Sequence, residues 1–428
     1  TALGRDTLNQ QTTASFNTAL GHQALNLNTS GSSNTASGYK ALYANTTGAE
    51  NVSVGALALD ANTTASGNSA LGYASLTANT TGASNTAVGQ SALQANTTAS
   101  NNTAIGKSAL VANTTADNNT AVGYQSLTAN TTGIYNLAIA PNTLAANTTG
   151  NFNIAIGGLA LTANTTGIEN VALGVNSLDS CTTGQNNVGL GNGTLAALTT
   201  SNNNTAVGRS AALAVTTGAH NTAVGAQAGS GVTTGAENVF MGYLAGKHIV
   251  AQTTGSGNIC IGPYTHTSAT GGNFATVIGY NVSGEAGYTT LGETGNDIRA
   301  AHGNITWATV SDERYKKDIV DSTAGLAFIN ALQPRTWKYK TLGELPETFR
   351  AYEAGSTEVF KNTQTNHGFI AQEVKAAIDA DDSIKDGFRL WDDRDDGSQE
   401  VAEAALIPVL VKAIQEQSAL ITALTDRI

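Results

Sequence analysis

The sequence is poor in charge and in cysteine. Only 12% of its 428 residues are charged, and the formal net charge is −11, so nothing in its composition favours a nucleic acid as partner. The two cysteines, Cys181 and Cys260, form no disulfide framework, and we expect both to be free. No run of eighteen apolar residues is present, so the sequence predicts no membrane span.

The few charges are also unevenly distributed. Residues 1–300 contain 16 charged side chains, whereas residues 301–428 contain 35. The N-terminal part still has regularly spaced apolar positions, so its low charge does not indicate disorder. The composition therefore predicts an uncharged body rich in Gly, Asn and Thr, followed by a domain of ordinary soluble composition.

In place of charge, the body has a repeat. An asparagine recurs every 17 residues from Asn17 to Asn238, and the next copy begins at Asn258 after a step of 20. An unbroken repeat of this length predicts stacked copies of one small unit and an elongated body. The first residues match the unit from its second position onward, so we expect the chain to be a piece of a longer protein.

One unit is shown well by residues 85–98, which read Asn-Thr-Ala-Val-Gly, then Gln-Ser-Ala-Leu-Gln, then Ala-Asn-Thr-Thr. The first five residues indicate a short strand that ends at Gly, and the Asn-Thr-Thr stretch indicates a turn. One repeat then forms one coil of a parallel β-solenoid. About sixteen coils would form a rod on the order of 75 Å long.

The predicted strand has two neighbouring apolar positions, which Ala87 and Val88 occupy in this unit. Neighbouring strand residues point to opposite faces, so one face can fill the coil and the other needs a cover. A coil with about four apolar side chains buries little surface alone, which predicts an obligate oligomer. The small alanine favours close approach around an axis. We interpret the oligomer as a homotrimer, although the pattern does not by itself fix three chains.

The repeated asparagine has two interpretations. Stacked Asn side chains can hydrogen-bond along a solenoid as a ladder, or they can form a regularly spaced array of ligand-binding groups. Eight Asn-Thr-Thr triplets also match the acceptor pattern for N-glycosylation. They recur because the turn recurs, so we interpret them as turns. They begin at Asn45, Asn62, Asn79, Asn96, Asn113, Asn130, Asn147 and Asn164.

Aromatic residues gather where the 17-residue period fails, from about Pro263 to Val310. A solenoid needs a cap over its apolar end, and exposed aromatic side chains also suit contacts with a carbohydrate or a receptor. Both interpretations can hold together. We therefore predict a distal cap or tip over residues 263–310, whose candidate receptor contacts are Tyr264, Phe274, Tyr280, Tyr288 and Trp307.

Two motifs follow the cap. Residues 311–316 read Ser-Asp-Glu-Arg-Tyr-Lys, and residues 367–374 read His-Gly-Phe-Ile-Ala-Gln-Glu-Val. Together they resemble the intramolecular chaperone domain of the peptidase S74 type, found at the C-terminus of phage tailspikes and tail fibres. This resemblance covers residues 311–428. The body resembles the head repeats of trimeric autotransporter adhesins, which form left-handed β-rolls, and more closely the Asn-Thr-Ala-Val-Gly repeats of phage tail fibres.

The chaperone resemblance implies a Ser–Lys dyad at Ser311 and Lys316, with the scissile bond between Val310 and Ser311. A lysine can take the proton of a serine hydroxyl when burial or a neighbouring cation lowers the lysine pKa. The implied activity is at most one self-cleavage per chain. The alternative interpretation of Ser311 is a helix N-cap or turn residue. Candidate supporting residues are Asp312, Arg314 and His367.

The end of the chain predicts a helix over about residues 403–428. Its apolar residues alternate steps of three and four, which is the heptad seam of a coiled coil with one polar layer. The alternative is a single amphipathic helix packed on its own domain. The seam mixes Ile and Leu and does not choose between two and three strands. It consists of Ile407, Leu410, Ile414, Gln417, Ile421, Leu424 and Ile428.

These patterns together predict a mainly β protein: a trimeric parallel β-solenoid or β-roll shaft at 1–262, the cap at 263–310 and an α+β chaperone domain at 311–428. The predicted function is a phage tail fibre in the virion that adheres to a host surface. The alternative is a bacterial surface or appendage adhesin. A polysaccharide-degrading tailspike is disfavoured, because the acids of the body form no pair in matching positions of adjacent coils.

The expected partners are further copies of the chain, a host receptor or glycan, and an upstream fibre or baseplate segment. No nucleic acid, membrane span, metal or cofactor is expected.

Overall fold

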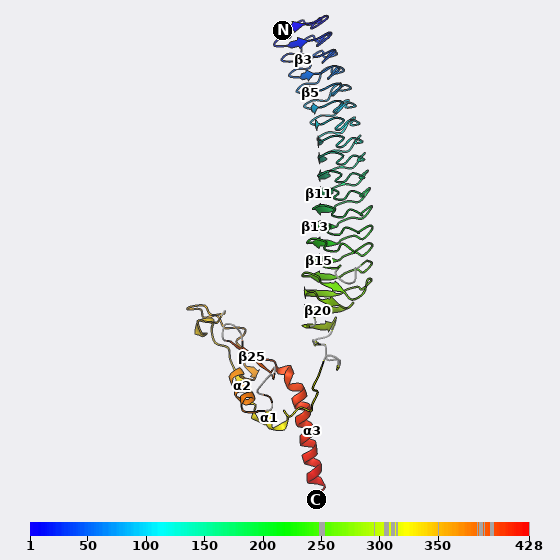
Figure 1. Ribbon diagram of the computed structural model, residues 1–428. Helices are drawn as coiled ribbons and strands as arrows, with labels where there is room; N and C mark the ends of the chain where they lie inside the picture. The colour runs from blue at the N-terminus through cyan, green and yellow to red at the C-terminus, as the bar shows by residue number, and fades with distance from the viewer. Residues whose placement is uncertain are drawn as a thin grey trace. The chain divides into compact units, whose positions relative to one another are not determined.

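The structure is a computed structural model of the chain (Figure 1). The chain divides into two compact units, Thr1–Val310 and Ser311–Ile428. The described residues are 1–247, 253–294, 296–303, 308, 309, 313, 316–349, 351–382, 384, 388, 390–393 and 398–427.

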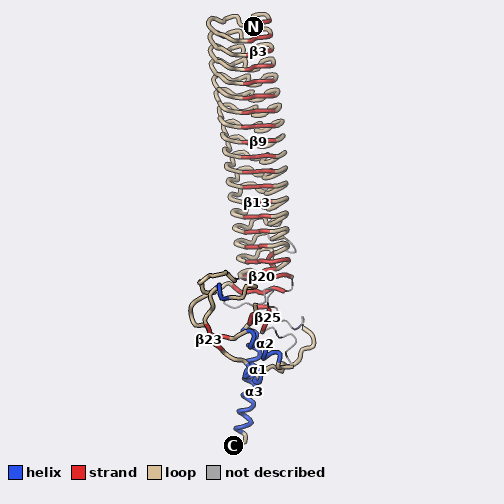
Figure 2. The backbone as a smooth tube through the Cα atoms, turned by 90° about the vertical axis from the view of Figure 1, so that its left-hand side faces the viewer, coloured by secondary structure: helices blue, strands red, loops and turns tan. Residues whose placement is uncertain are grey.

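The N-terminal unit is a parallel β-solenoid in which each coil contributes one short strand (Figures 1 and 2). Equivalent residues of successive coils pair in register, as Ala87 does with Ala104 and Ala104 with Ala121. The ladder begins with β1 (Ala2–Leu3) and confirms the predicted solenoid of 17-residue coils.

The strands that follow β1 are β2 (Thr18–Leu20), β3 (Thr35–Ser37), β4 (Val52–Val54), β5 (Ser69–Leu71), β6 (Thr86–Val88), β7 (Thr103–Ile105), β8 (Thr120–Val122), β9 (Leu137–Ile139), β10 (Ile154–Ile156), β11 (Val171–Leu173), β12 (Val188–Leu190), β13 (Thr205–Val207), β14 (Thr222–Val224), β15 (Val239–Met241) and β16 (Ile259–Ile261).

The ladder continues beyond the last repeated asparagine. Strand β18 (Thr276–Tyr280) pairs with β16, and β20 (Tyr288–Glu293) pairs with β18, both in parallel. The antiparallel strands β21 (Asn296–Ala301) and β22 (Ala308–Thr309) then end the sheet, and β17 (His266–Thr267) and β19 (Ser283–Gly284) form a separate parallel pair. One further 17-residue step is hidden from the sequence pattern because Ala275 stands where the repeat has Asn.

The solenoid interior is filled by small and medium apolar side chains. In the coil of β6, Ala87 at the middle of the strand and Leu93 in the following turn are both fully buried. In β15 the same strand position holds Phe240, and its ring takes the space where Gly229 and Gly246 have no Cβ. The interior is therefore packed along the whole ladder, with a larger residue matched by smaller neighbours.

The outer side of each strand stays partly open to solvent. The third strand residue is a Val, Ile or Leu in most coils and is half-exposed in a single chain, as for Leu20, Leu71 and Ile105. The apolar face that the sequence expects to need a cover is thus present and uncovered by the chain itself.

The repeated asparagines form a buried ladder, which confirms their structural interpretation. Asn187 is typical: its Oδ1 accepts the backbone N–H of Asn204 at 3.0 Å, and its Nδ2 donates to the carbonyl oxygen of Ser201 at 2.8 Å. Asn187 is fully buried, and the same bonds recur along the ladder. Each coil therefore supplies its neighbour with hydrogen-bond partners that water cannot reach.

The asparagines of the Asn-Thr-Thr turns form a second buried ladder. Asn96 Nδ2 donates to Asn79 Oδ1 at 2.8 Å and to the Ala99 carbonyl oxygen at 2.9 Å. These amides are buried, so the turn interpretation holds. The side-chain nitrogen to which an N-linked glycan would attach is not accessible in these turns. The ladder ends at Asn164, whose Oδ1 has no partner because Cys181 replaces the next Asn.

Both cysteines are free and buried, as expected. Burial raises the pKa of the Cys181 thiol to about 11 and that of Cys260 to about 12. Both therefore stay protonated at neutral pH and act as small apolar side chains.

The C-terminal unit is a small α+β unit. Its apolar core includes Phe328, Val374, Ile378, Leu390 and Leu406. Two short antiparallel pairs, β23–β24 and β25–β26, lie in this unit. The elements are α1 (Leu326–Ala331), β23 (Arg335–Trp337), η2 (Leu342–Glu344), β24 (Asn366–Gly368), α2 (Ala371–Asp379), β25 (Trp391–Asp393), β26 (Gln399–Val401), η3 (Glu403–Ala405) and α3 (Leu406–Thr425).

The buried ladder predicts a large difference between two asparagines of one coil. Replacing Asn187 by Ala leaves the Asn204 N–H and the Ser201 carbonyl buried without this partner, and each such group costs about 1–3 kcal/mol. We expect N187A to lower the stability by about 2–4 kcal/mol per chain. The exposed Asn192 is the matched control, and N192A should leave the thermal unfolding midpoint unchanged. Equal midpoints for the two variants would contradict a stabilising ladder.

The glycine that ends each strand gives a second test. Gly89 has a φ of 130°, and a Cβ there would lie 2.6 Å from the carbonyl oxygen of Gly106. We expect G89A to destabilise the solenoid by about 1–3 kcal/mol, the usual cost of backbone strain. At Gly158 φ is not in this range and a Cβ would meet open space, so G158A should be neutral or slightly stabilising in chemical denaturation. A neutral G89A would contradict this requirement for glycine.

Candidate functional site

The C-terminal unit begins at the predicted processing site. Val310, Ser311, Asp312 and Arg314 lie outside the described residues, so the geometry of the predicted dyad remains a prediction. Lys316 is described, and its backbone N–H donates to the Glu313 carbonyl oxygen at 2.9 Å.

The segment after Lys316 is fully on the surface of one chain. Residues 316–323 are exposed and adopt no helix or strand. A lysine that acts as a base needs surroundings that exclude water or a neighbouring cation. A single chain leaves Lys316 in contact with water, so a water-excluding site at this position requires a cover from elsewhere.

His367 lies on the short sheet of the unit. It is an exposed residue of β24 and lies opposite Thr336 of β23. Its role in the site remains a prediction.

The motif around β24 and α2 has a structural function. Glu373 lies in the first turn of α2 and forms a two-pronged ion pair with Arg335 of β23, with N–O distances of 2.8 and 3.0 Å. The Arg335 hydrogen bond lowers the pKa of the Glu373 carboxyl. Val374 and Ile378 of the same helix are buried in the core. The motif thus attaches α2 to the β23–β24 pair.

A contact that the sequence did not predict joins the start of the unit to its last helix. The backbone N–H of Leu326, at the start of α1, donates to Glu416 Oε2 of α3 at 2.8 Å. Gly325 permits this approach, because a Cβ there would collide with the Glu416 carboxylate. The Lys412 Nζ atom lies 3.6 Å from Glu416 Oε1 on the same helix. The sequence signal for this contact is Glu416, a single acidic residue in a mostly apolar helix. That signal does not identify the partner, which lies 90 residues away in the chain.

The helix α3 is buried on one side only. Leu406, Val409 and Ala413 face the core of their own unit. The described residues of the predicted seam are exposed instead, and Ile428 lies outside the described residues. The exposed seam residues are Ile407, Leu410, Ile414, Gln417, Ile421 and Leu424.

The single chain therefore does not use the seam to pack this helix on its own domain. By length and composition alone, the segment Glu403–Thr425 is also long and apolar enough to cross a membrane. The sequence, which has no run of eighteen apolar residues, predicts no such segment.

An open groove lies in the C-terminal unit beside α2 and β25–β26. Its volume is about 1570 Å³, and aromatic side chains such as Trp337, Phe369 and Trp391 line it. Lys375 lies over the Trp391 ring, with Nζ 5.0 Å from the ring centroid. Among the described residues, no group of three or more His, Cys, Asp or Glu side chains could hold a metal ion.

Two of the predicted receptor contacts lie together at the cap. The Tyr264 ring meets Tyr243 and Tyr280 edge to face, with centroid distances of 5.3 and 5.9 Å. Phe274 is exposed and covers Gly257. Tyr243, Tyr264 and Tyr280 thus form an aromatic cluster on the last coils of the ladder.

Tyr288 belongs to a different cluster. The Arg299 guanidinium carbon lies 5.3 Å from the centroid of the Tyr288 ring, and Arg299 forms an ion pair with Glu285 at 2.9 Å. The structure thus places the described candidate contacts in three places, Tyr264 with Tyr280, Phe274 at Gly257 and Tyr288 with Arg299, and Trp307 lies outside the described residues.

Comparison with known protein families gives one match. Residues 311–382 match the model of the peptidase S74 family, described as the chaperone of endosialidase. No curated protein and no solved structure matches the chain. The matched segment starts where the second compact unit starts, and it includes Lys316, β23–β24 and α2. The chain therefore joins a parallel β-solenoid of 17-residue coils to a chaperone-of-endosialidase segment, as the sequence predicted.

Proposed function

We propose that the protein is a homotrimeric fibre of the tail-fibre type that attaches to a host surface, and that its C-terminal unit directs assembly. The observation that carries this proposal is the combination of a chaperone-of-endosialidase segment with a solenoid whose apolar strand face is uncovered. Both features need further copies of the chain.

The solenoid supports association along its length. Partly exposed Val, Ile and Leu side chains recur at the third position of most strands and form a long apolar stripe, which Ser37 interrupts in β3. Such a stripe is stable in water when other copies bury it, since burial stabilises by about 25 cal/mol per Å² of apolar surface. Three copies around one axis would cover all three stripes.

The helix α3 supports association at the C-terminal end. Its exposed side carries apolar residues at heptad spacing, while its opposite side packs on the unit. In the proposed trimer, the three seams form a coiled coil and Gln417 is its polar layer. The coiled coil brings three chains together before their solenoids have formed.

A clamp of this kind solves a folding problem that the repeat creates. Because every coil is nearly the same, two chains can pair with a slip of 17 residues at little local cost. A parallel solenoid also closes slowly and exposes unpaired edges while it forms. A trimer held at the C-terminal unit fixes the alignment, and coils then add one after another away from it.

Self-cleavage would make assembly irreversible. In the proposed reaction, Lys316 takes the proton of the Ser311 hydroxyl, and the hydroxyl oxygen attacks the Val310 carbonyl carbon. The bond between Val310 and Ser311 breaks, the proton passes to the new amino group, and water hydrolyses the ester. The division of the chain into compact units at this bond supports the location. Loss of the chaperone leaves a fibre that unfolds slowly, which is kinetic stability.

The attachment role rests on the cap. Tyr264, Tyr280 and Phe274 present aromatic surface near the last coils, and aromatic side chains combine a large apolar area with little loss of side-chain entropy. The proposed location is the virion, with the tip in contact with the host surface. A bacterial surface adhesin built from the same shaft and chaperone is the alternative.

The cleavage proposal is tested by the intact mass of the purified chain. The natural chain should yield a fragment with the mass of residues 311–428, whereas S311A and K316A should remain uncut, a decrease in cleavage of at least about 100-fold. S322A and K317A are matched controls in the same exposed segment and should be cut normally. An uncut natural chain would mean that the unit is retained as a permanent cap.

The assembly proposal is tested at the exposed seam. I414D places a charge in the proposed coiled-coil core, and we expect it to reduce the trimeric fraction at least about tenfold in analytical ultracentrifugation, because a buried unpaired charge costs several kcal/mol. Gln415 is exposed and lies outside the seam, so Q415D should assemble normally. If both variants assemble like the natural chain, the seam does not hold the copies together.

A further inference from the structure

The first coils of the solenoid carry a polar and aromatic cluster that the fold does not require. The residue after the strand-ending glycine is Tyr at positions 39, 73, 124, 243 and 280, and other coils have Arg, His, Ala, Gln, Lys, Pro, Gly, Val or Asn there. The solenoid therefore accepts almost any side chain in this column. Tyr39 and Tyr73 nevertheless are 47% and 55% exposed, and exposed aromatic side chains are typical of surfaces that contact another molecule.

The spacing of these two tyrosines leaves room for one ring between them. Successive coils keep register here, since Leu57 N–H donates to the Tyr39 carbonyl oxygen and Ala74 N–H to that of Ala56. Tyr39 and Tyr73 thus lie two coils apart, at roughly 9–10 Å. The coil between them has only the methyl group of Ala56 in this column. We call this gap, bounded by Tyr39, Ala56 and Tyr73, the tyrosine slot.

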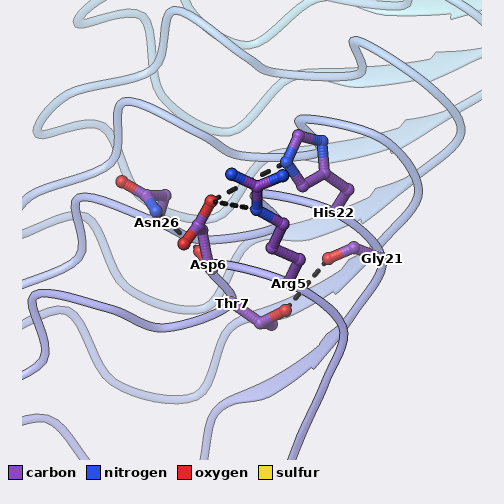
Figure 3. Close-up of polar contacts among 6 residues, drawn as sticks. All are labelled: Arg5, Asp6, Thr7, Gly21, His22 and Asn26. Carbon is purple, nitrogen blue, oxygen red and sulfur yellow. Dashed lines mark hydrogen bonds and ion pairs between the residues drawn. The ribbon is translucent and has the colours of Figure 1, made fainter.

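One wall of the slot is held in place by its neighbours. The His22 ring of the preceding coil stacks on Tyr39, with centroids 5.6 Å apart and planes inclined by 18°. The Asp6 carboxylate lies between Arg5 and His22, with its Oδ2 atom 3.4 Å from Arg5 Nε and 3.7 Å from His22 Nε2 (Figure 3). The Tyr39 ring is therefore positioned before any ligand arrives, which lowers the entropy cost of binding.

Polar groups lie beside the slot. The Lys40 ammonium is 5.6 Å from the centroid of the Tyr39 ring and 5.3 Å from that of Tyr43. Asp60, one coil beyond Tyr43, is within the electrostatic reach of Lys40. A donor, Lys40, therefore stands next to the Tyr39 wall, and the acceptor Asp60 is within its electrostatic reach, in a shaft that otherwise has very few charged side chains.

The geometry points to a carbohydrate-binding site in the tyrosine slot, which would hold one pyranose ring of a surface polysaccharide between Tyr39 and Tyr73. A ring in contact with both walls needs about 4.0–4.5 Å on each side, or about 8–9 Å in total. A flat aromatic ligand needs about 3.5 Å on each side and would be loose. Sugar hydroxyls would bind Lys40 and Asp60. This site on the shaft is additional to the proposed contacts at the cap, and it rests on the proposed attachment function.

The test uses the full chain on an array of oligosaccharides from bacterial capsules and lipopolysaccharides. We expect the natural chain to bind a subset of them, and Y39A, Y73A and A56L to reduce that binding at least tenfold. A56L fills the slot without removing a tyrosine. Tyr124 is the matched control: it lies in the same column and is 47% exposed, but two coils away it has Gln90 and Gly158 instead of a second tyrosine. Y124A should bind within twofold of the natural chain.

Three results would overturn the slot. The first is unchanged oligosaccharide binding by Y73A and A56L, whatever the effect of Y280A at the cap. If Y280A alone abolishes binding, the slot is wrong but the proposed attachment at the cap stands. The second is an equal loss with Y124A, which would indicate nonspecific contacts of tyrosine. The third is a Y73A chain that fails to assemble like the natural chain in ultracentrifugation, which would place the tyrosines at an interface between copies.

Discussion

The whole shaft depends on side-chain amides that hydrogen-bond where water cannot reach. A 17-residue coil turns its backbone so tightly that several N–H and carbonyl groups point inward, and each needs a partner. Asn187 and its equivalents supply both a donor and an acceptor from one short side chain. Because each amide bonds to the next coil as well as to its own, a coil is complete only when it has a neighbour. This explains why the period is strict and why the asparagine hardly varies over the repeats.

The solenoid could be predicted from the sequence because its determinants are local and repeated: one strand, one turn and one buried amide recur in each unit. The turn ladder was not foreseen, since Asn-Thr-Thr is typical of any polar turn. The left-handed conformation of Leu93, with a φ of 51°, was equally hidden. Locally such a leucine is unfavourable by about 1–2 kcal/mol, and only its complete burial in the stacked coils makes it acceptable.

The C-terminal unit was predictable in kind but not in detail. Its two motifs identify the family segment, and the apolar spacing of α3 was sufficient to predict a seam that the structure leaves exposed. The bond from Leu326 to Glu416 was not predictable, because it joins residues 90 positions apart and depends on a missing Cβ at Gly325. Ser311 lies outside the described residues, so the predicted dyad rests on the motif alone.

The constant register of the strands also makes the coil a unit of length. Adding or deleting 17 residues anywhere between Asn17 and Asn238 restores the same strand pairs and the same amide bonds on both sides of the change. Each such event would lengthen or shorten the shaft by about 4.8 Å without a new packing problem. Unequal recombination between nearly identical repeats could therefore adjust the reach of the protein in fixed increments, while both ends of the solenoid keep their own sequences.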